Sequence, residues 1–90
     1  MKNRYFKLFW DETTKDELTD SWGKSTYYFE IDESLKVIKQ IQFFENHKKL
    51  KYDEKNHEDK YGFLTDQTLE IKDFEDNEIS EIDFYKIWIK

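Results

Sequence analysis

Residues 26–44 read TYYFEIDESLKVIKQIQFF, and this stretch decides the fold. Its first part alternates between two sets of side chains, Tyr27, Phe29 and Ile31 on one side and Tyr28, Glu30 and Asp32 on the other. A period of two residues is typical of a β-strand, and aromatic and β-branched side chains fit its pleated surface. The pattern therefore predicts a strand from Thr26 to Ile31.

Residues 35–44 fit either a helix or a strand. A helix would explain the three-residue spacing of four apolar side chains, Leu35, Ile38, Ile41 and Phe44. A strand would place Val37, Ile41 and Phe43 on one face. The turn-like sequence at 45–48 and the renewed alternation around Leu50 and Tyr52 favour a β-hairpin, so we predict a strand on each side of that turn.

The two ends of the chain supply the remaining regular elements. Residues 4–10 alternate like a strand, and we expect Trp10 to lie in the core with Phe6 and Leu8. Near the other end, Ser80 and Asp83 resemble a helix capping box, while Ile79 and Phe84 resemble a hydrophobic staple. A helix is therefore predicted from Glu81 to about Trp88, with Phe84, Ile87 and Trp88 facing the sheet.

The segments between these elements are polar. Residues 11–24 and 53–60 are predicted to be loops, and the latter to be solvated. A short aromatic cluster at 61–64, together with Leu69 and Ile71, is expected to cover one edge of the sheet.

These elements predict an α+β fold, an antiparallel sheet of about four strands with a C-terminal helix packed on one face. The 90 residues suffice for a single domain spanning 1–90. The chain has no cysteine, which excludes disulfides and thiolate metal sites. It contains neither a signal peptide nor an apolar run near the roughly 20 residues needed to span a membrane, so we expect a cytoplasmic protein.

The net charge of −6 lies entirely in the second part of the chain. Residues 1–50 carry nine basic and nine acidic side chains, whereas residues 51–90 carry six basic and twelve acidic ones. Within residues 66–83, Lys72 is the single base among eight acids. Such a field repels nucleic acids and anionic membranes, and it attracts a basic protein.

The acidic segment supplies the candidate partner-binding residues. We expect carboxylates to cover the basic surface of a protein partner, with exposed aromatic side chains as anchors. The candidates are Glu58, Asp59, Asp66, Glu70, Asp73, Glu75, Asp76 and Glu78 among the acids, and Trp22 and Tyr61 among the aromatics. The structural alternative is that the acids only solvate a loop and favour the first turn of the helix.

The sequence contains no recognisable motif for catalysis or cofactor binding. His47 and His57 are isolated, and the residues from Asp73 lack the glycine and the final glutamate of a calcium loop. Two glycines and four serines form no phosphate loop or nucleophile elbow. We therefore expect no metal, no cofactor and no enzymatic activity.

The chain resembles a family of small uncharacterised bacterial domains of about the same length. The matching features are Trp10, the stretch YFEIDE at 28–33, IQFF at 41–44, Leu64, EIS at 78–80 and FYKIW at 84–88. The resemblance implies strands at 25–31 and 35–44, and it places His47 where the family usually has a turn glycine. Some members lie beside genes for polymorphic toxins, which implies an immunity role.

Charge and resemblance together lead to one expectation about function. The protein is expected to be an immunity protein that neutralises a cognate toxin, such as a nuclease, by covering its basic surface. The alternative is a stand-alone interaction or regulatory domain without enzymatic activity. In either case we expect a monomer or a weak dimer.

Overall fold

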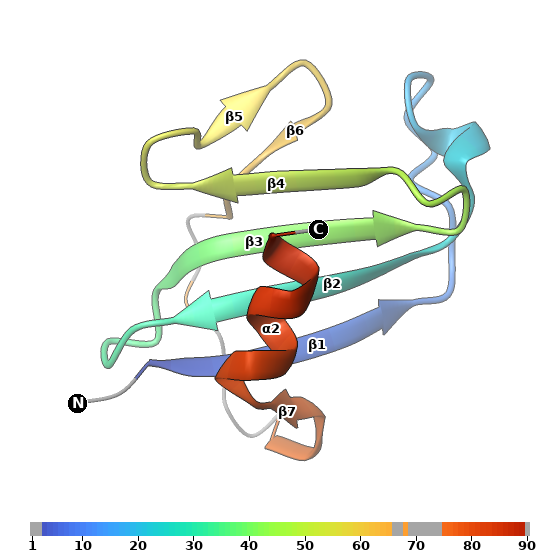
Figure 1. Ribbon diagram of the computed structural model, residues 1–90. Helices are drawn as coiled ribbons and strands as arrows, with labels where there is room; N and C mark the ends of the chain where they lie inside the picture. The colour runs from blue at the N-terminus through green and yellow to red at the C-terminus, as the bar shows by residue number, and fades with distance from the viewer. Residues whose placement is uncertain (1–2, 66–67, 69–74, 90) are drawn as a thin grey trace.

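The computed structural model describes residues 3–65, 68 and 75–89. Its main feature is a five-stranded antiparallel sheet in the order β4-β3-β2-β1-β7, crossed on one face by a helix (Figure 1). The elements of this layer are β1 (Arg4–Trp10), β2 (Ser25–Ile31), β3 (Val37–Phe44), β4 (Lys49–Asp53), β7 (Glu78–Ile79) and α2 (Glu81–Trp88). The α+β prediction is confirmed, and the strand added to the expected four is the two-residue β7.

Strand pairing sorts the side chains onto two faces of the sheet. Tyr5 of β1 lies opposite Glu30 of β2, which in turn lies opposite Lys39 of β3, so all three point to the face that carries α2. The ambiguous block is thus a strand, although it begins only at Val37. The register shifts between Glu30 and Ile31, and this irregularity lets Val37 pack on the opposite face.

The helix begins and ends at identifiable contacts. Ser80 Oγ accepts a hydrogen bond from the Asp83 amide at 3.1 Å, which confirms the predicted N-cap. At the other end, Lys49 and Lys51 of β4 donate to the Ile87 and Trp88 carbonyl oxygens at 2.8 and 2.9 Å. These lysines satisfy the last carbonyls and neutralise the negative end of the helix dipole.

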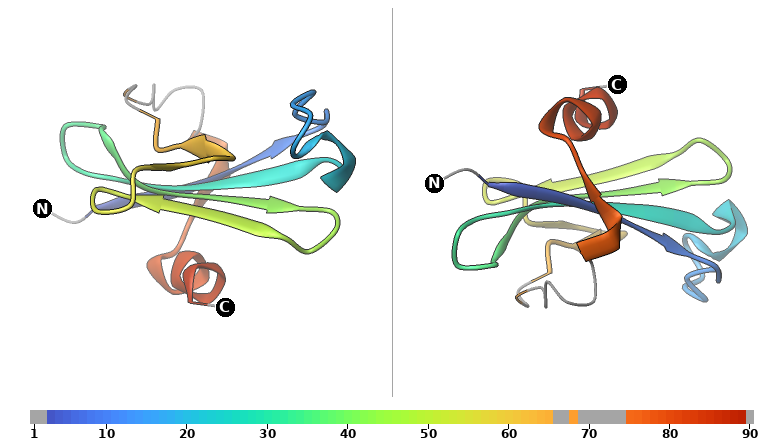
Figure 2. Two further views of the ribbon diagram at one scale, coloured as in Figure 1. Left: turned by 90° about the horizontal axis from the view of Figure 1, so that it is seen from above. Right: turned by 90° about the horizontal axis from the view of Figure 1, so that it is seen from below.

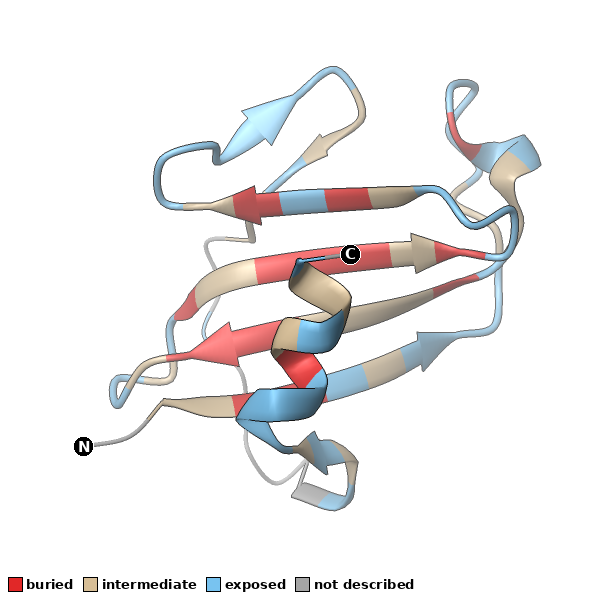
Figure 3. Cartoon of the chain, in the orientation of Figure 1, coloured by how far each residue is buried: buried red, intermediate tan, exposed pale blue. Residues whose placement is uncertain are grey.

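A core lies on each face of the sheet. Under the helix, Phe84 is fully buried against Tyr5 and Ile41. On the opposite face, one cluster contains Phe6, Phe29, Ile31 and Val37, and a second contains Phe44, Leu50 and Tyr52. Both faces are therefore covered, and burial is highest in the central strands (Figure 3).

Long connections between the strands cover the second face of the sheet (Figure 2). One is the 11–24 loop, which contains a 3-10 turn, η1 (Asp20–Trp22). The other is a small hairpin of β5 (Glu58–Asp59) and β6 (Gly62–Phe63). The loop predicted at 53–60 is thus partly a strand, although residues 54–60 are exposed as expected. Leu69 and Ile71 lie outside the described residues.

The two tryptophans assigned to the core are less buried than expected. Trp10 is 45% exposed, so its assignment to the core is wrong. It lies opposite Ser25 at the end of β1, where the small serine offers little surface to pack against. Trp88 is half-buried and stacks on Phe84 with 6.1 Å between ring centroids.

His47 adopts the backbone conformation that turns usually give to glycine. Its φ is +70° in the tight connection between β3 and β4, where its amide donates to the Phe44 carbonyl at 2.9 Å. In the part of the chain that the structure describes, no helix has the length and apolarity of a membrane span.

Candidate partner-binding site

The predicted docking residues are only partly described. Asp66, Glu70 and Asp73 lie outside the described residues, as does the side chain of Glu75. The described candidates divide into two groups, one on the β5–β6 hairpin and one at β7. The hairpin lies beside β4, and β7 pairs with β1, so the groups lie towards opposite edges of the sheet (Figure 1).

Asp59 in the first group organises its own hairpin. Its Oδ1 accepts hydrogen bonds from the Tyr52 hydroxyl at 2.8 Å and from the Tyr61 and Gly62 amides at 2.8 and 3.2 Å. Burial, followed by this contact with Asp59, raises the pKa of Tyr52 well above its usual range. Asp59 is therefore a structural residue although it is exposed, which leaves Glu58 as the exposed acid of this group without such a role.

The second group, Asp76 and Glu78, is followed in the chain by two further exposed acids. Asp76, Glu78, Glu81 and Asp83 are all exposed where β7 leads into α2, and we call these four residues the acidic corner. Glu78 takes two hydrogen bonds from the Arg4 guanidinium, at 2.8 and 3.0 Å. These bonds hold the pKa of Glu78 below its usual range. Arg4 thus neutralises part of the corner, whereas the carboxylates of Asp76 and Asp83 have no ion pair or hydrogen bond with the residues that the structure describes.

A hollow of about 470 Å³ opens beside this corner. Three carboxylates line it, from Glu30, Glu78 and Glu81, together with Asn3, Arg4, Tyr5, Ile79 and Tyr85. Glu30 is the buried one of these three carboxylates. It accepts hydrogen bonds from Asn3 at 2.7 Å, Tyr5 at 3.2 Å and Tyr85 at 2.6 Å, and Lys39 lies 3.6 Å away.

The two phenols of this network predict a loss of stability at alkaline pH. Burial raises the pKa of Tyr5 and of Tyr85, and the hydrogen bonds to Glu81 and Glu30 raise them further. The stabilisation is therefore complete below the unfolded-state pKa of about 10 and decreases as the pH rises above it. Urea unfolding at about pH 9 and about pH 11 should show the decrease, and it should be smaller in Tyr5→Phe. Equal unfolding free energies at both pH values would contradict it.

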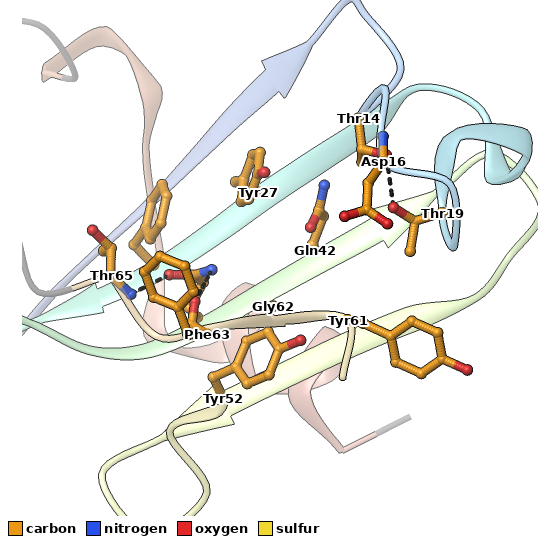
Figure 4. Close-up of a pocket in the computed structure, with 12 residues that line it drawn as sticks. Thr14, Asp16, Thr19, Tyr27, Gln42, Tyr52, Tyr61, Gly62, Phe63 and Thr65 are labelled. Carbon is orange, nitrogen blue, oxygen red and sulfur yellow. Dashed lines mark hydrogen bonds between the residues drawn. The ribbon is translucent and has the colours of Figure 1, made fainter. Parts of the chain in front are cut away.

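The two predicted aromatic anchors lie together on the other face of the sheet. Trp22 packs on Tyr61 and on Phe44, each with 5.1 Å between ring centroids. Trp22 is therefore half-buried rather than fully exposed to solvent, and the Lys48 ammonium group lies 5.3 Å from its ring centre. Tyr61 lies at the border of a second hollow, of about 460 Å³, between the 11–24 loop and the β5–β6 hairpin (Figure 4).

Sequence reasoning missed the residues that shape this second hollow. Gln40 and Gln42 of β3 point to this face and are buried. Gln40 donates to the Phe63 carbonyl at 3.3 Å and accepts from the Thr65 amide at 3.0 Å, so it holds β6 against the sheet. The available signal was two glutamines alternating with apolar residues inside a buried strand.

Comparisons with known proteins found no similar protein. No protein-family model, no curated protein and no solved structure matches the chain. Within residues 3–65, 68 and 75–89, no three histidine or carboxylate side chains come together as a metal site would require.

Proposed function

We propose that this protein is an immunity protein that binds and neutralises a cognate bacterial toxin in the cytoplasm, without chemistry of its own. The main support for this proposal is the acidic corner, four exposed carboxylates at the junction of β7 and α2. The hollow beside it adds the carboxylate of Glu30.

Long-range electrostatics support a basic partner. A surface of one sign attracts the opposite sign over a Debye length of about 8 Å at physiological salt, and it accelerates association more than it tightens the complex. The basic side chains that grip nucleic acid in a nuclease are of this opposite sign. Covering them with carboxylates would block the substrate.

The alternative, a regulatory interaction domain, uses the same surface and differs in its partner. Expressing the product of the neighbouring gene with and without this protein separates the two. Restored growth and a salt-sensitive complex support immunity. A harmless neighbour that does not bind would contradict it.

Charge reversal at the acidic corner tests which surface docks. In the double variant Asp76→Lys and Asp83→Lys, association with a basic partner should be at least about tenfold slower at low salt, because steering is lost. Stopped-flow association rates at several salt concentrations measure the effect. Glu78 and Glu81 are left unchanged because Arg4 and Tyr5 bind them.

A matched control reverses two acids elsewhere. Glu12 and Glu33 are exposed and far from the corner in sequence, so Glu12→Lys with Glu33→Lys changes the net charge by the same amount. The control should slow association much less. Equal slowing in both double variants would mean that net charge, and not this corner, steers the partner.

A further inference from the structure

The hollow on the sheet face opposite α2 has the size and lining of a binding pocket. Its volume of about 460 Å³ falls within the range of small-ligand sites. Figure 4 shows Thr14 and Asp16 entering it from the 11–24 loop, and Tyr27 and Gln42 rising from the sheet. The β5–β6 segment, with Tyr61, Gly62 and Phe63, borders another side.

Two polar atoms in this pocket lack partners within the described part of the chain. Gln42 is only 7% exposed, and its Nε2 donates to Ser25 Oγ at 3.0 Å, whereas its Oε1 accepts no hydrogen bond from the described residues. The Tyr27 hydroxyl likewise has no hydrogen-bond partner among them. No fully buried side-chain nitrogen or oxygen in the described part of the chain lacks a partner, so the Gln42 oxygen is open to the pocket, where it can accept a hydrogen bond from a ligand.

The charge and shape of the lining specify the donor. Asp16 is the one charged side chain among the described residues that line the pocket. Tyr27 and Phe29 stack with an interplanar angle of 3°, so they present flat aromatic surface. Acceptors at several positions beside aromatic rings match a planar cation, because a guanidinium carries five donors in one plane and packs on aromatic faces.

We propose that this pocket receives an arginine side chain of the protein partner, with the guanidinium donating to Gln42 Oε1, the Tyr27 hydroxyl and the Asp16 carboxylate. This inference rests on the proposed function in requiring a basic partner. Arginine in an aromatic pocket is a frequent hot spot of protein interfaces. Tyr61 lines the pocket and Trp22 packs on Tyr61, so these two aromatic side chains would support the contact from one side.

The pocket can be tested on the free protein, without the partner. Methylguanidinium chloride is titrated into ¹⁵N-labelled protein, with methylammonium chloride at equal ionic strength as the comparison. Saturable shifts at residues 14–19 and at the Gln42 side-chain amide are expected for methylguanidinium and not for methylammonium. Equal shifts with both cations, or no shifts at these residues, would overturn the proposal.

Two variants and one control locate the effect. Asp16→Asn keeps the oxygen that accepts from the Leu18 amide at 2.8 Å and should weaken methylguanidinium binding about tenfold. Tyr27→Phe removes only the unpaired hydroxyl and should weaken it about threefold. Asp53→Asn is the matched control, since Asp53 holds a similar turn through the Lys55 and Asn56 amides and does not line the pocket. Undiminished binding in both pocket variants would contradict the assignment.

A last pair of probes separates the sources of the guanidinium. N-acetyl-arginine amide, which mimics an arginine within a chain, should bind at least as tightly as free arginine. Tighter binding of free arginine by more than about tenfold would assign the pocket to a metabolite and overturn the protein-partner proposal. Because no toxin is present, these outcomes are independent of whether the immunity function holds.

Discussion

Phe84→Ala is expected to lower the free energy of unfolding by about 3–5 kcal/mol, the usual cost of deleting a buried aromatic ring. Phe84 is fully buried, and its ring lies 5.2 Å from the rings of both Tyr5 and Tyr85. The loss is a large fraction of the roughly 5–15 kcal/mol that holds a small domain together. Urea unfolding monitored by circular dichroism measures it.

The control lies on the same helix. Ile82 is 69% exposed, so Ile82→Ala should change the free energy of unfolding by no more than about 0.5 kcal/mol. An equal loss in both variants would mean that Phe84 contributes no more than an exposed residue of the same helix, which would contradict its burial against the sheet. An unchanged midpoint in Phe84→Ala would contradict the placement of α2 on the sheet.

The regular elements were predictable because their signals are local. Alternation over 4–10 and 26–31, and the capping box at Ser80, depend on residues within one turn or one strand. The fifth strand was not predictable. Glu78 and Ile79 pair with Phe6 and Tyr5, more than seventy positions away, and two residues carry no detectable period.

Burial was predicted less well because it depends on what lies above each face. Trp10 shares a face with Phe6, and alternation alone gives both the same environment. The structure buries Phe6 completely and leaves Trp10 at the uncovered end of the strand. Trp88 was expected to be a core residue, yet the Lys39 and Lys51 ammonium groups lie 5.4 and 5.1 Å from its ring centre, and it remains half-buried.

Sequence-based prediction of the candidate site was limited in the same way, because the role of each residue depends on its neighbours in space. Counting charge located the acidic corner, because its four residues lie close together in the chain, between positions 76 and 83. Counting could not separate Asp59, which organises a hairpin through its hydrogen bonds, from Glu58 beside it, although both are exposed. The second pocket draws its lining from the 11–24 loop, three strands and the β5–β6 hairpin, and no single stretch of sequence contains its pattern.

The alternating pattern predicted the face on which Glu30 lies, but not that this carboxylate is buried and hydrogen-bonded. Alternation placed it on the face opposite Phe29, as the register confirms. A carboxylate there would ordinarily indicate a solvent-exposed face. The helix covers this face instead, so Glu30 becomes the buried acceptor for residues of the N-terminus, β1 and α2.

Glu30→Ala is expected to lower the free energy of unfolding by about 3 kcal/mol, because it leaves several polar partners without an acceptor. Tyr85 and Asn3 lose their bonds to the carboxylate, and Lys39 loses the anion 3.6 Å away. The partial exposure of Lys39, at 29% of its side chain, keeps the loss below that of a fully buried pair. Urea unfolding at neutral pH measures it.

Glu30→Gln separates charge from hydrogen bonding at the same position. Glutamine retains one acceptor oxygen and the side-chain volume, so its cost should be nearer about 1 kcal/mol, the value of one ordinary hydrogen bond. If the alanine and glutamine variants are equally destabilised, the ion pair with Lys39 dominates the network. If both remain as stable as the parent, Glu30 does not hold the helix to the sheet, and its burial serves the acidic hollow alone.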